Sequence, residues 1–374
     1  MTPLRAWTEI DLSAFERNLK NIIRAIPKDI EFISVVKADA YGHGLTQIVE
    51  RSLQSGIKAF AVANIQEALE IRNVGVGWPI LILGALLPGE GHFIPNSDFI
   101  PTISSLDEAK RLDAACKIQK ATVKVHLKVD TGMGRLGIWY QEMQKCTDYI
   151  ESSMNVNLSG IYTHFSSASS DLKYTNLQRD RFFNSIKSIK NISKLKIHAD
   201  SSASLLSQNK FGRCNAVRVG LLQYGIYPMD SPFFSSISIS STLSFYTKVG
   251  LVKKLPKGTP ISYGKTYSLI KDSKLAILTA GYADGIPLNY SSKGSVIIHD
   301  SICPILGRIT MDQVIVDISN VKGVLAGDVV TLIGKTSNNE IKLEEFCSNS
   351  GSIPWEILCS LTKRVQRVYV NSRN

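Results

Sequence analysis

The chain has 374 residues, of which 44% are hydrophobic and 20% charged, and its formal net charge at pH 7 is +11. At roughly 150 residues per domain, this length predicts two domains, each with a full hydrophobic core. Length and composition exclude a disulfide-stapled mini-protein and a disordered chain.

The distribution of charge and the spacing of the cysteines indicate which partners and which cellular compartment to expect. The basic residues are spread along the chain, and no basic block is interleaved with aromatic residues as nucleic-acid surfaces often are. We therefore expect a solvated basic surface, with a field that attracts anionic small molecules as the sharper alternative. The six cysteines form no Cys-x-x-Cys pair, which predicts reduced, buried thiols. With no signal segment and no run of about 18 apolar residues, the sequence predicts a cytoplasmic protein.

Short apolar runs alternate with amphipathic stretches over the first part of the chain, which predicts an N-terminal (β/α)8 barrel. The pairs Ser13/Glu16 and Ser105/Glu108 have the spacing of capping boxes at helix starts. The connection after 80–83 lacks a helical pattern, because prolines and glycines interrupt it. The expected strands are 32–36, 59–63, 80–83, 99–103, 123–129, 158–162, 195–197 and 217–219, and the expected helices are 45–53, 65–73, 106–118, 141–152 and 176–189.

The pattern changes after a serine-rich stretch at 231–241. Beyond it, strands alternate without long helices, which predicts a smaller, mainly antiparallel β domain. We expect residues 1–236 to form the barrel, although the first few could pack with the second domain, and residues 237–374 to form the β domain. The expected strands here are 245–252, 274–279, 295–299, 314–318 and 329–333, with helical residues at 343–347 and 356–362.

Polar residues stand at the ends of the otherwise apolar barrel strands. A charged group there is costly unless it is paired or used, and barrel enzymes carry their chemistry on the C-terminal face. We therefore expect a site built from these positions. They are Lys37, Asn64, Asp130, His164, Asp200 to Ser202, and Arg218.

The segment Val-Val-Lys-Ala-Asp-Ala-Tyr-Gly-His-Gly at 35–44 carries the strongest signal. Burial in a barrel mouth would favour the neutral amine of Lys37, which suits Schiff-base chemistry, whereas a lone lysine at a strand end more often extends into solvent. Tyr41 follows closely enough to share the same mouth. Gly42 and Gly44 allow the backbone to bend closely around a ligand.

This string resembles the pyridoxal 5'-phosphate (PLP) attachment site of alanine racemases, and the resemblance extends from Trp7 to Arg364. It implies a homodimer that interconverts L- and D-alanine in two shared active sites, supplying D-alanine for cell-wall peptidoglycan. Lys37 would hold the cofactor covalently and serve as one of two catalytic bases.

The string Lys128-Val-Asp-Thr-Gly-Met-Gly-Arg135-Leu-Gly has two readings. Its Gly-x-Gly-x-x-Gly matches the dinucleotide fingerprint, but the preceding strand is the fifth of its series and the expected acidic residue is missing. The racemase resemblance instead implies that Arg135 binds the substrate carboxylate and that Lys128, often carbamylated in the family, braces it. An exposed cluster of little energetic value is the plain alternative for Lys128.

The resemblance also assigns the remaining cofactor contacts in the barrel. Arg218 would face the pyridine nitrogen, and because guanidinium keeps its proton, the ring would be a weaker electron sink. His164 would pack by the ring and support Arg218; a satisfied core histidine is the plain alternative. The phosphate would be bound by the amides of Gly220 and Leu221 and the hydroxyls of Ser202 and Tyr41.

The resemblance places the second base in the β domain. Tyr263 would act in the partner subunit's site from the face opposite Lys37, Met311 would contact the substrate carboxylate through its backbone, and Tyr282 and Asp312 would line the entry. Some positions depart from the family strings, and these departures bear on affinity and substrate range rather than on the chemistry. These are Ser201, Leu288, Thr310 and Lys363.

Other functions stay open at this point. A broader amino-acid racemase and a PLP-dependent decarboxylase fit the same scaffold, and an amino-acid panel would separate them. A cofactor-carrying barrel without catalysis is disfavoured by the β domain with Tyr263. Nucleic-acid binding rests on charge alone. Six histidines without paired spacing argue against a metal site, and no membrane partner is expected.

Overall fold

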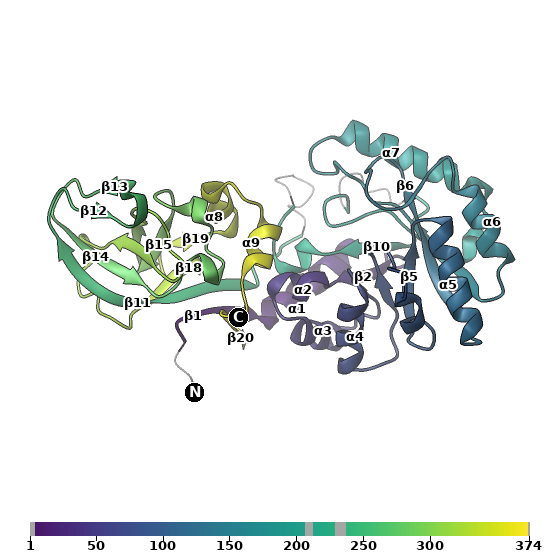
Figure 1. Ribbon diagram of the computed structural model, residues 1–374, viewed down its shortest axis with the longest axis horizontal. Coiled ribbons are helices and arrows are strands. Elements are labelled where there is room, and N and C mark those ends of the chain that lie inside the picture. The colour runs from purple at the N-terminus through teal and green to yellow at the C-terminus, as the bar shows by residue number, and fades with distance from the viewer. Residues whose placement is uncertain (1–3, 206–211, 229–236, 373–374) are drawn as a thin grey trace. The chain divides into compact units, whose positions relative to one another are not determined.

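The computed structural model describes residues 4–205, 212–228 and 237–372. The chain divides into two compact units. The barrel unit comprises Phe15–Ala40 and Leu45–Ser240, and the β unit comprises the described residues of Met1–Ala14, Tyr41–Gly44 and Ser241–Asn374. Figure 1 labels the elements of both units. The expected boundary at 236/237 lies at the edge of the described residues. Residues 231–236, the larger part of the serine-rich stretch, lie outside them.

Eight parallel strands form the sheet of the barrel unit, as the alternating pattern predicted. They are hydrogen-bonded in the order β10-β2-β3-β4-β5-β6-β8-β9. A parallel bridge between Ser201 and Arg218 joins the two ends of this order, so the sheet closes nearly completely (Figure 1). The strands are β2 (Glu31–Val35), β3 (Phe60–Val62), β4 (Ile80–Ile82), β5 (Phe99–Ile103), β6 (Val123–Asp130), β8 (Val156–Tyr162), β9 (Lys196–His198) and β10 (Ala216–Val219); β7 (Ile138–Trp139) pairs with β6 at its end.

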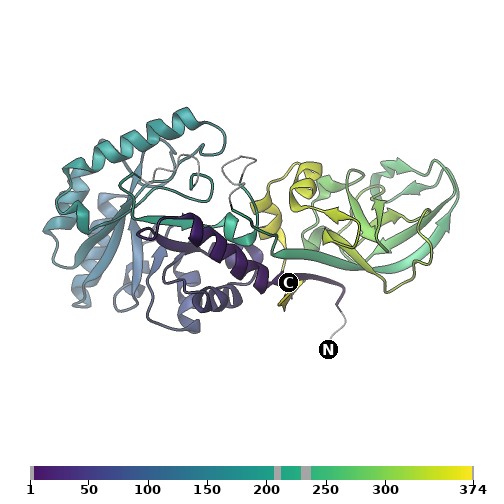
Figure 2. The same cartoon turned by 180° about the vertical axis from the view of Figure 1, so that it is seen from behind.

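Helices cover the outside of this sheet because each has one apolar face. Phe15, Leu19 and Ile22 of α1 are fully buried, and Figure 2 shows α1 against the outside of the barrel unit. The last helix begins four residues before its expected start at 176, and a 3-10 turn replaces its expected end. These helices are α1 (Leu12–Ala25), α3 (Leu45–Gln54), α4 (Ile65–Val74), α5 (Leu106–Ile118), α6 (Gln144–Ser152) and α7 (Leu172–Ser185). The segment α2 (Lys37–Gly42) is a left-handed turn rather than one of these covering helices, and after β4 only the 3-10 helix η1 (Glu90–Phe93) intervenes, as expected.

One of the two expected helix caps is confirmed. The Ser105 side chain accepts a hydrogen bond from the Glu108 amide at the start of α5. The prediction of a capping box at Ser13 and Glu16 is wrong. Asp11, the residue before α1, instead accepts from the amides of Ser13 and Ala14, because an aspartate oxygen caps a helix as well as a serine does.

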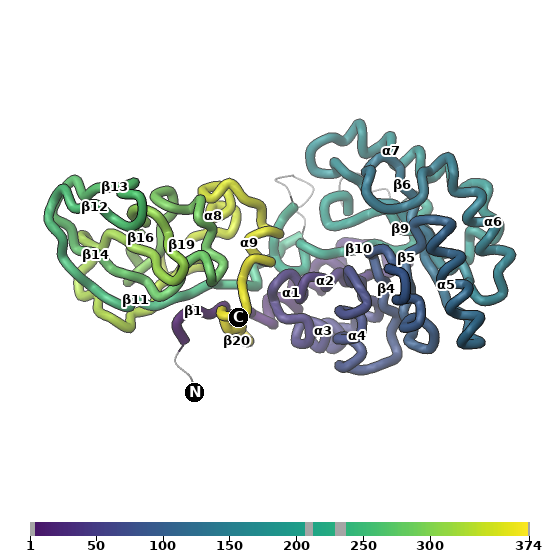
Figure 3. Tube along the Cα trace, in the orientation of Figure 1, coloured from purple at the N-terminus to yellow at the C-terminus, as the bar shows by residue number. Residues whose placement is uncertain are grey.

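The β unit is built on a mainly antiparallel sheet, also as expected. Its strand order is β16-β15-β18-β11-β1-β20, with β14 and β17 continuing from β11. The N-terminal strand β1 lies between β11 and the C-terminal β20, and Figure 3 shows the purple β1 beside the yellow β20. The strands are β1 (Ala6–Asp11), β11 (Leu243–Leu255), β14 (Ser273–Leu278), β15 (Ser295–Ile298), β16 (Ser301–Pro304), β17 (Val314–Asp317), β18 (Val329–Lys335), β19 (Glu340–Ile341) and β20 (Gln366–Val370), with a separate hairpin of β12 (Pro260–Ile261) and β13 (Tyr267–Ser268).

Two short helices and a buried aromatic pair complete the core of the β unit. They are α8 (Leu343–Ser350) and α9 (Pro354–Ser360). The rings of Tyr290 and Phe346 lie 4.2 Å apart between centroids, and both side chains are fully buried. A second cluster of Ile261, Leu269, Leu275 and Leu306 supports the β12–β13 hairpin, whose two strands lie before and after Tyr263 in the chain.

Five of the six cysteines are buried, as predicted, whereas Cys359 is exposed. Burial raises the pKa of the Cys146, Cys214 and Cys347 thiols to about 12, so these three stay protonated at neutral pH. Among the described helices, none is long and apolar enough to cross a membrane.

Candidate active site

The barrel gathers its strand-end residues on one face. Lys37 follows β2, His164 follows β8, Ser202 follows β9, and Arg218 lies in β10. Because all eight strands are parallel, their carboxyl ends share one rim. The structure therefore brings together the barrel residues that the sequence analysis assigned to this site, with Lys128 in β6 beside them.

Lys37 opens a left-handed turn. Ala38, Asp39, Ala40 and Tyr41 have φ between 51° and 55°, although none of them is glycine. A left-handed conformation costs an L-residue roughly 1–2 kcal/mol, so the surrounding structure must hold this turn in place. Strain of this kind concentrates at functional sites, and here it begins directly after the lysine that the sequence singled out.

The end of the turn belongs to the β unit. Tyr41 is 7% exposed, and burial raises the pKa of its hydroxyl, so the phenol stays protonated. The Gly42 carbonyl accepts from Arg367 Nε at 3.1 Å, and a Cβ at Gly42 would lie 2.2 Å from the Leu358 carbonyl oxygen. Gly42 is therefore required both for its positive φ of 76° and for this close approach.

The loop after β6 presents Arg135 to solvent. The Asp130 carboxylate accepts from the amides of Gly132, Met133 and Gly134 at 2.9 to 3.2 Å, which closes a tight turn ahead of the arginine. A dinucleotide fingerprint needs a helix directly after its glycines, whereas this loop runs into β7. The dinucleotide reading is therefore excluded.

Lys128 is buried among other cations. Its side chain is 5% exposed, and its ammonium lies 5.5 Å from the ring centroid of Tyr162. Burial first, and then the charges of Arg135, Arg218 and Lys37, lower its pKa to about 8. A fraction of Lys128 is therefore neutral and nucleophilic near neutral pH, and the region has an excess of positive charge that an anionic ligand would relieve.

The low pKa of Lys128 predicts how stability depends on pH. The folded chain releases this proton near pH 8, while the unfolded chain keeps it to about 10.5, so the unfolded state binds more protons between these values. In buffer free of CO2, we expect Lys128 to raise the free energy of unfolding across this window by up to ~1.4 kcal/mol per pH unit. Buried thiols such as Cys146 lower stability over the same range in any variant, because they keep protons that the unfolded chain releases. The measured quantity is therefore the difference in free energy of unfolding between the wild type and Lys128→Met, from urea unfolding; it should increase with pH, and a constant difference would contradict the prediction.

Arg218 is held by neutral histidines. Its Nη1 donates to His198 Nδ1 at 2.5 Å, and its Nη2 lies 3.3 Å from His164 Nδ1. His198 Nε2 in turn lies 2.9 Å from His126 Nδ1. Burial, followed by the charge of Arg218, lowers the pKa of His126 and His164 to about 3, so both rings are neutral acceptors or donors at pH 7.

Three features complete the surroundings of Arg218. Tyr162 stacks on His198 with centroids 4.6 Å apart and an interplanar angle of 11°. A Cβ at Gly160 would lie 2.4 Å from His126 Nε2, so glycine makes room for that imidazole. Burial lowers the pKa of Arg218, but a guanidinium starts so high that it keeps its proton.

Ser202 and Gly220 meet at the ends of β9 and β10. The Ser202 hydroxyl accepts from the Gly220 amide at 3.0 Å and from the Leu222 amide at 3.5 Å. Leu221 opens the short 3-10 helix η4 (Leu221–Tyr224) directly after Gly220. The hydroxyl and these backbone amides form a small set of donors at the rim of the barrel.

The β unit presents its predicted residues on exposed loops. Tyr263 is 71% exposed in η6 (Tyr263–Lys265), and the flanking residues Ser262 and Lys265 both have positive φ. The Ser262 hydroxyl donates to the Arg308 carbonyl at 2.5 Å. A tyrosine that is exposed on a strained and anchored loop is placed to contact another molecule rather than to pack in the core of its own unit.

Tyr282, Met311 and Asp312 lie close together in the same unit. The Tyr282 amide donates to the Thr310 carbonyl, and a Cβ at Gly281 would lie 2.5 Å from the Met311 carbonyl oxygen. Tyr282 is 42% exposed and Met311 is 52% exposed. This loop pair therefore forms an open surface.

Arg364 ties this surface to the C-terminal segment. Its guanidinium lies 2.8 Å from Asp312 and 3.2 Å from Asp284. Lys363, next to it, is exposed.

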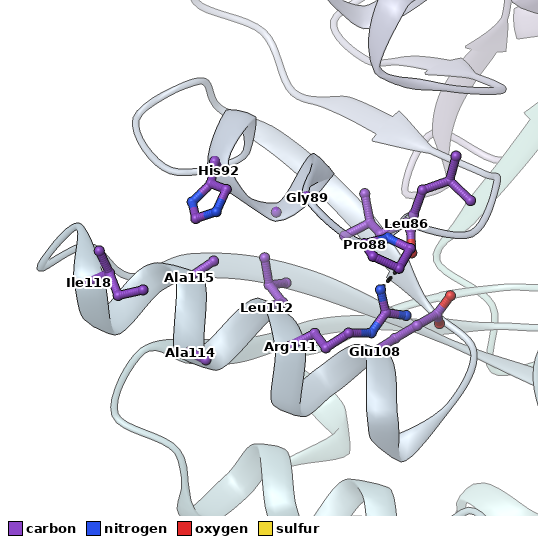
Figure 4. Close-up of a pocket in the computed structure, with 12 residues that line it drawn as sticks. Leu86, Pro88, Gly89, His92, Glu108, Arg111, Leu112, Ala114, Ala115 and Ile118 are labelled. Carbon is purple, nitrogen blue, oxygen red and sulfur yellow. Dashed lines mark hydrogen bonds between the residues drawn. The ribbon is translucent and has the colours of Figure 1, made fainter.

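A groove elsewhere on the barrel unit is unrelated to these residues. It lies between α5 and η1, where Leu112, His92 and Ile118 contribute to its lining (Figure 4). None of the predicted site residues lines it. The chemistry is therefore concentrated at the strand ends and not in this groove.

Sequence reasoning missed the histidine pair behind Arg218. His126 and His198 lie at the interior of the barrel on β6 and β9, and both are buried. Histidine within an otherwise apolar inner strand was the available signal, because a polar side chain there needs a polar partner.

The fold and these residues define a class: an enzyme with a (β/α)8 barrel whose strand ends hold a strained lysine turn and several cations, suited to covalent chemistry on an anionic small molecule. Two family models match, "Alanine racemase, N-terminal domain" over residues 10–228 and "Alanine racemase, C-terminal domain" over residues 242–369. The chain belongs to the alanine racemase family, and it is an isomerase.

Known relatives resemble the chain along nearly its full length. An alanine racemase of Halothermothrix orenii is 35% identical over 371 residues, covering 98% of this chain and 97% of the relative. The solved alanine racemase of Clostridium difficile 630 has a TM-score of 0.93 at 29% identity, covering 99% and 97%. An alanine racemase of Bartonella henselae with covalently bound pyridoxal phosphate has a TM-score of 0.89 at 28% identity, covering 98% and 100%.

Proposed function

We propose that this protein is a PLP-dependent enzyme that interconverts L-alanine and D-alanine by a two-base mechanism. The observation that carries the proposal is the strained turn at Lys37 on the rim where the charges of Lys128, Arg135 and Arg218 converge. The family supports a role in the cytoplasm, where D-alanine would enter cell-wall peptidoglycan.

The barrel residues fit PLP by their charge and chemistry. The excess of cations that depresses the pKa of Lys128 favours a ligand carrying phosphate and carboxylate groups. Lys37 would hold the cofactor covalently and Arg218 would face the pyridine nitrogen, with His164 beside it. The phosphate would be bound by four groups: the hydroxyls of Ser202 and Tyr41 and the amides of Gly220 and Leu221.

When bound, PLP draws electrons from the substrate α-carbon and so acidifies the α-proton. Arg218 would limit this pull, because it keeps its own proton and leaves the ring nitrogen without one. The neutral His198 and His164 support this assignment, since each can accept from Arg218 and neither competes with it for charge.

Substrate binding would use Arg135 for the carboxylate, with the Met311 backbone as a second contact. The pKa of about 8 leaves Lys128 partly neutral, and a neutral amine can add CO2 and release a proton to solvent to become an anionic carbamate. We propose that carbamylated Lys128 braces Arg135, which would otherwise stand among like charges.

The two bases would come from two subunits of a homodimer. Lys37 would hold or move a proton on one face of the α-carbon, and Tyr263 of the partner subunit would do so on the other. The exposure of Tyr263, Tyr282 and Met311 supports their use at a subunit interface. Tyr282 and Asp312 would line the entry.

The test is an assay of L-alanine with and without added PLP. We expect D-alanine to form in a PLP-dependent manner, and ethylamine and CO2 not to form. Decarboxylation products would favour the decarboxylase alternative, and comparable rates across a panel of L-amino acids would favour a broader racemase. No turnover of any amino acid with PLP present would contradict the proposal.

A further inference from the structure

We propose that Glu67 is a positioning residue that fixes the direction in which Lys37 points. The inference rests on the proposed function, because it concerns the lysine that would hold PLP. Glu67 lies in the first turn of α4, half-buried, 30 residues beyond Lys37.

Both oxygens of the Glu67 carboxylate are engaged by backbone amides. Oε1 accepts from Ala38 N at 2.7 Å, and Oε2 accepts from Ala63 N at 2.7 Å. The Glu67 amide itself donates to the side chain of Asn64, the residue that caps α4, at 3.0 Å. The carboxylate is thus anchored on a capped helix and bridges the segments that follow β2 and β3.

The Glu67 carboxylate joins the two segments beyond the point where backbone hydrogen bonds between β2 and β3 end. Val36 N donates to Ala61 O at 2.9 Å, which is the last backbone bond between the two segments before Lys37. The next amide after Lys37 is that of Ala38, and it donates to Glu67. Lys37 therefore lies between two fixed amides, and the second of them is fixed by a side chain.

The location of the bridge explains why a side chain is needed. Ala38 is the first residue with left-handed backbone, so the chain departs there from the strand path and no neighbouring strand can accept its amide. Within the same turn, Asp39 Oδ1 accepts from the amide of Leu45, the first residue of α3, at 2.7 Å. Two carboxylates thus hold the turn, and the Glu67 bond is the one adjacent to Lys37.

A charged acceptor is suited to this task because hydrogen bonds to an ionised group are shorter and stronger than neutral ones. Loss of the bond would free the peptide after Lys37 and let its side chain point in several directions. Misplacement of a reacting group by about 1 Å costs on the order of 100-fold in rate. The effect should fall on steps that use the Lys37 amine, not on substrate affinity.

The variants are Glu67→Ala, which removes both acceptors, and Glu67→Gln, which keeps one. Glu50→Gln is the matched control, since it neutralises an exposed glutamate on α3 of the same unit. Full-length proteins are mixed with PLP, and the increase in visible absorbance is used to monitor covalent attachment. Borohydride then makes the bond permanent, and peptide mass spectrometry shows whether the attached residue is Lys37. Urea unfolding of each protein is measured alongside, together with kcat and KM for alanine.

We expect Glu67→Ala to attach PLP about 10- to 100-fold more slowly than the wild type, and kcat to fall while KM for alanine stays within about twofold. Glu67→Gln should fall between Glu67→Ala and the control, and it decides the outcome if Glu67→Ala does not fold. Attachment rates and kcat of folded Glu67 variants equal to those of Glu50→Gln would overturn the inference. Failure of the wild type itself to attach PLP would instead contradict the proposed function.

Discussion

Replacing Lys37 with alanine is expected to abolish both the yellow absorbance of the PLP-bound protein and its racemase activity. The covalent link to the cofactor and one of the two bases would be lost together, so activity should fall below about 10⁻⁴ of the wild type. Absorbance spectra and D-alanine formation measure the two effects separately.

The control for this variant is Lys58→Ala, which removes an exposed lysine from the same unit. It should keep both properties. A Lys37→Ala protein that remains yellow and active would show that another amine holds the cofactor, and the proposed site would then be wrong.

Replacing Tyr263 with phenylalanine is expected to remove most racemisation while the protein stays folded and yellow. A positioned acid–base group contributes about 10²–10⁴-fold, and the hydroxyl is the part of Tyr263 that can move a proton. The loss should be largest in the direction in which Tyr263 removes the α-proton. Initial rates from L-alanine and from D-alanine measure it, and unchanged rates both ways would refute the two-base mechanism.

Tyr267→Phe is the matched control, because Tyr267 lies four residues later and packs against the cluster that includes Ile261 and Leu306. Its activity should stay near that of the wild type. Mixed dimers then test where Tyr263 acts. A chain with Lys37→Ala and a chain with Tyr263→Phe form one intact site if each site uses both subunits, which restores about a quarter of the wild-type activity in an equal mixture. Sites built within one chain would restore none.

The sequence predicted the barrel and its strand-end residues because parallel strands with short apolar runs leave few alternatives. Lys37, His164 and Arg218 could be placed on one rim from their positions alone, since carboxyl ends of parallel strands share a face. The helix cap at Asp11 was missed because two adjacent polar residues competed for one role.

The supporting contacts were beyond sequence reasoning. Glu67 and Ala38 are far apart in the chain, and their bond depends on a left-handed turn that Ala38, Ala40 and Tyr41 disfavour. The chain from Arg218 through His198 to His126 likewise depends on strand register and on the space left by Gly160. Local patterns carry no record of such contacts, because they form only when distant segments pack.

The most direct test of the account is to incubate the purified protein with L-alanine in deuterium oxide, with and without PLP, and to follow the α-carbon by NMR at early times. We predict that D-alanine forms only with PLP and carries deuterium at the α-carbon, while the remaining L-alanine largely keeps its proton. Two bases on opposite faces give this pattern, because the proton removed on one face is replaced from the other. D-alanine that retains the original proton, or no D-alanine at all, would contradict the account.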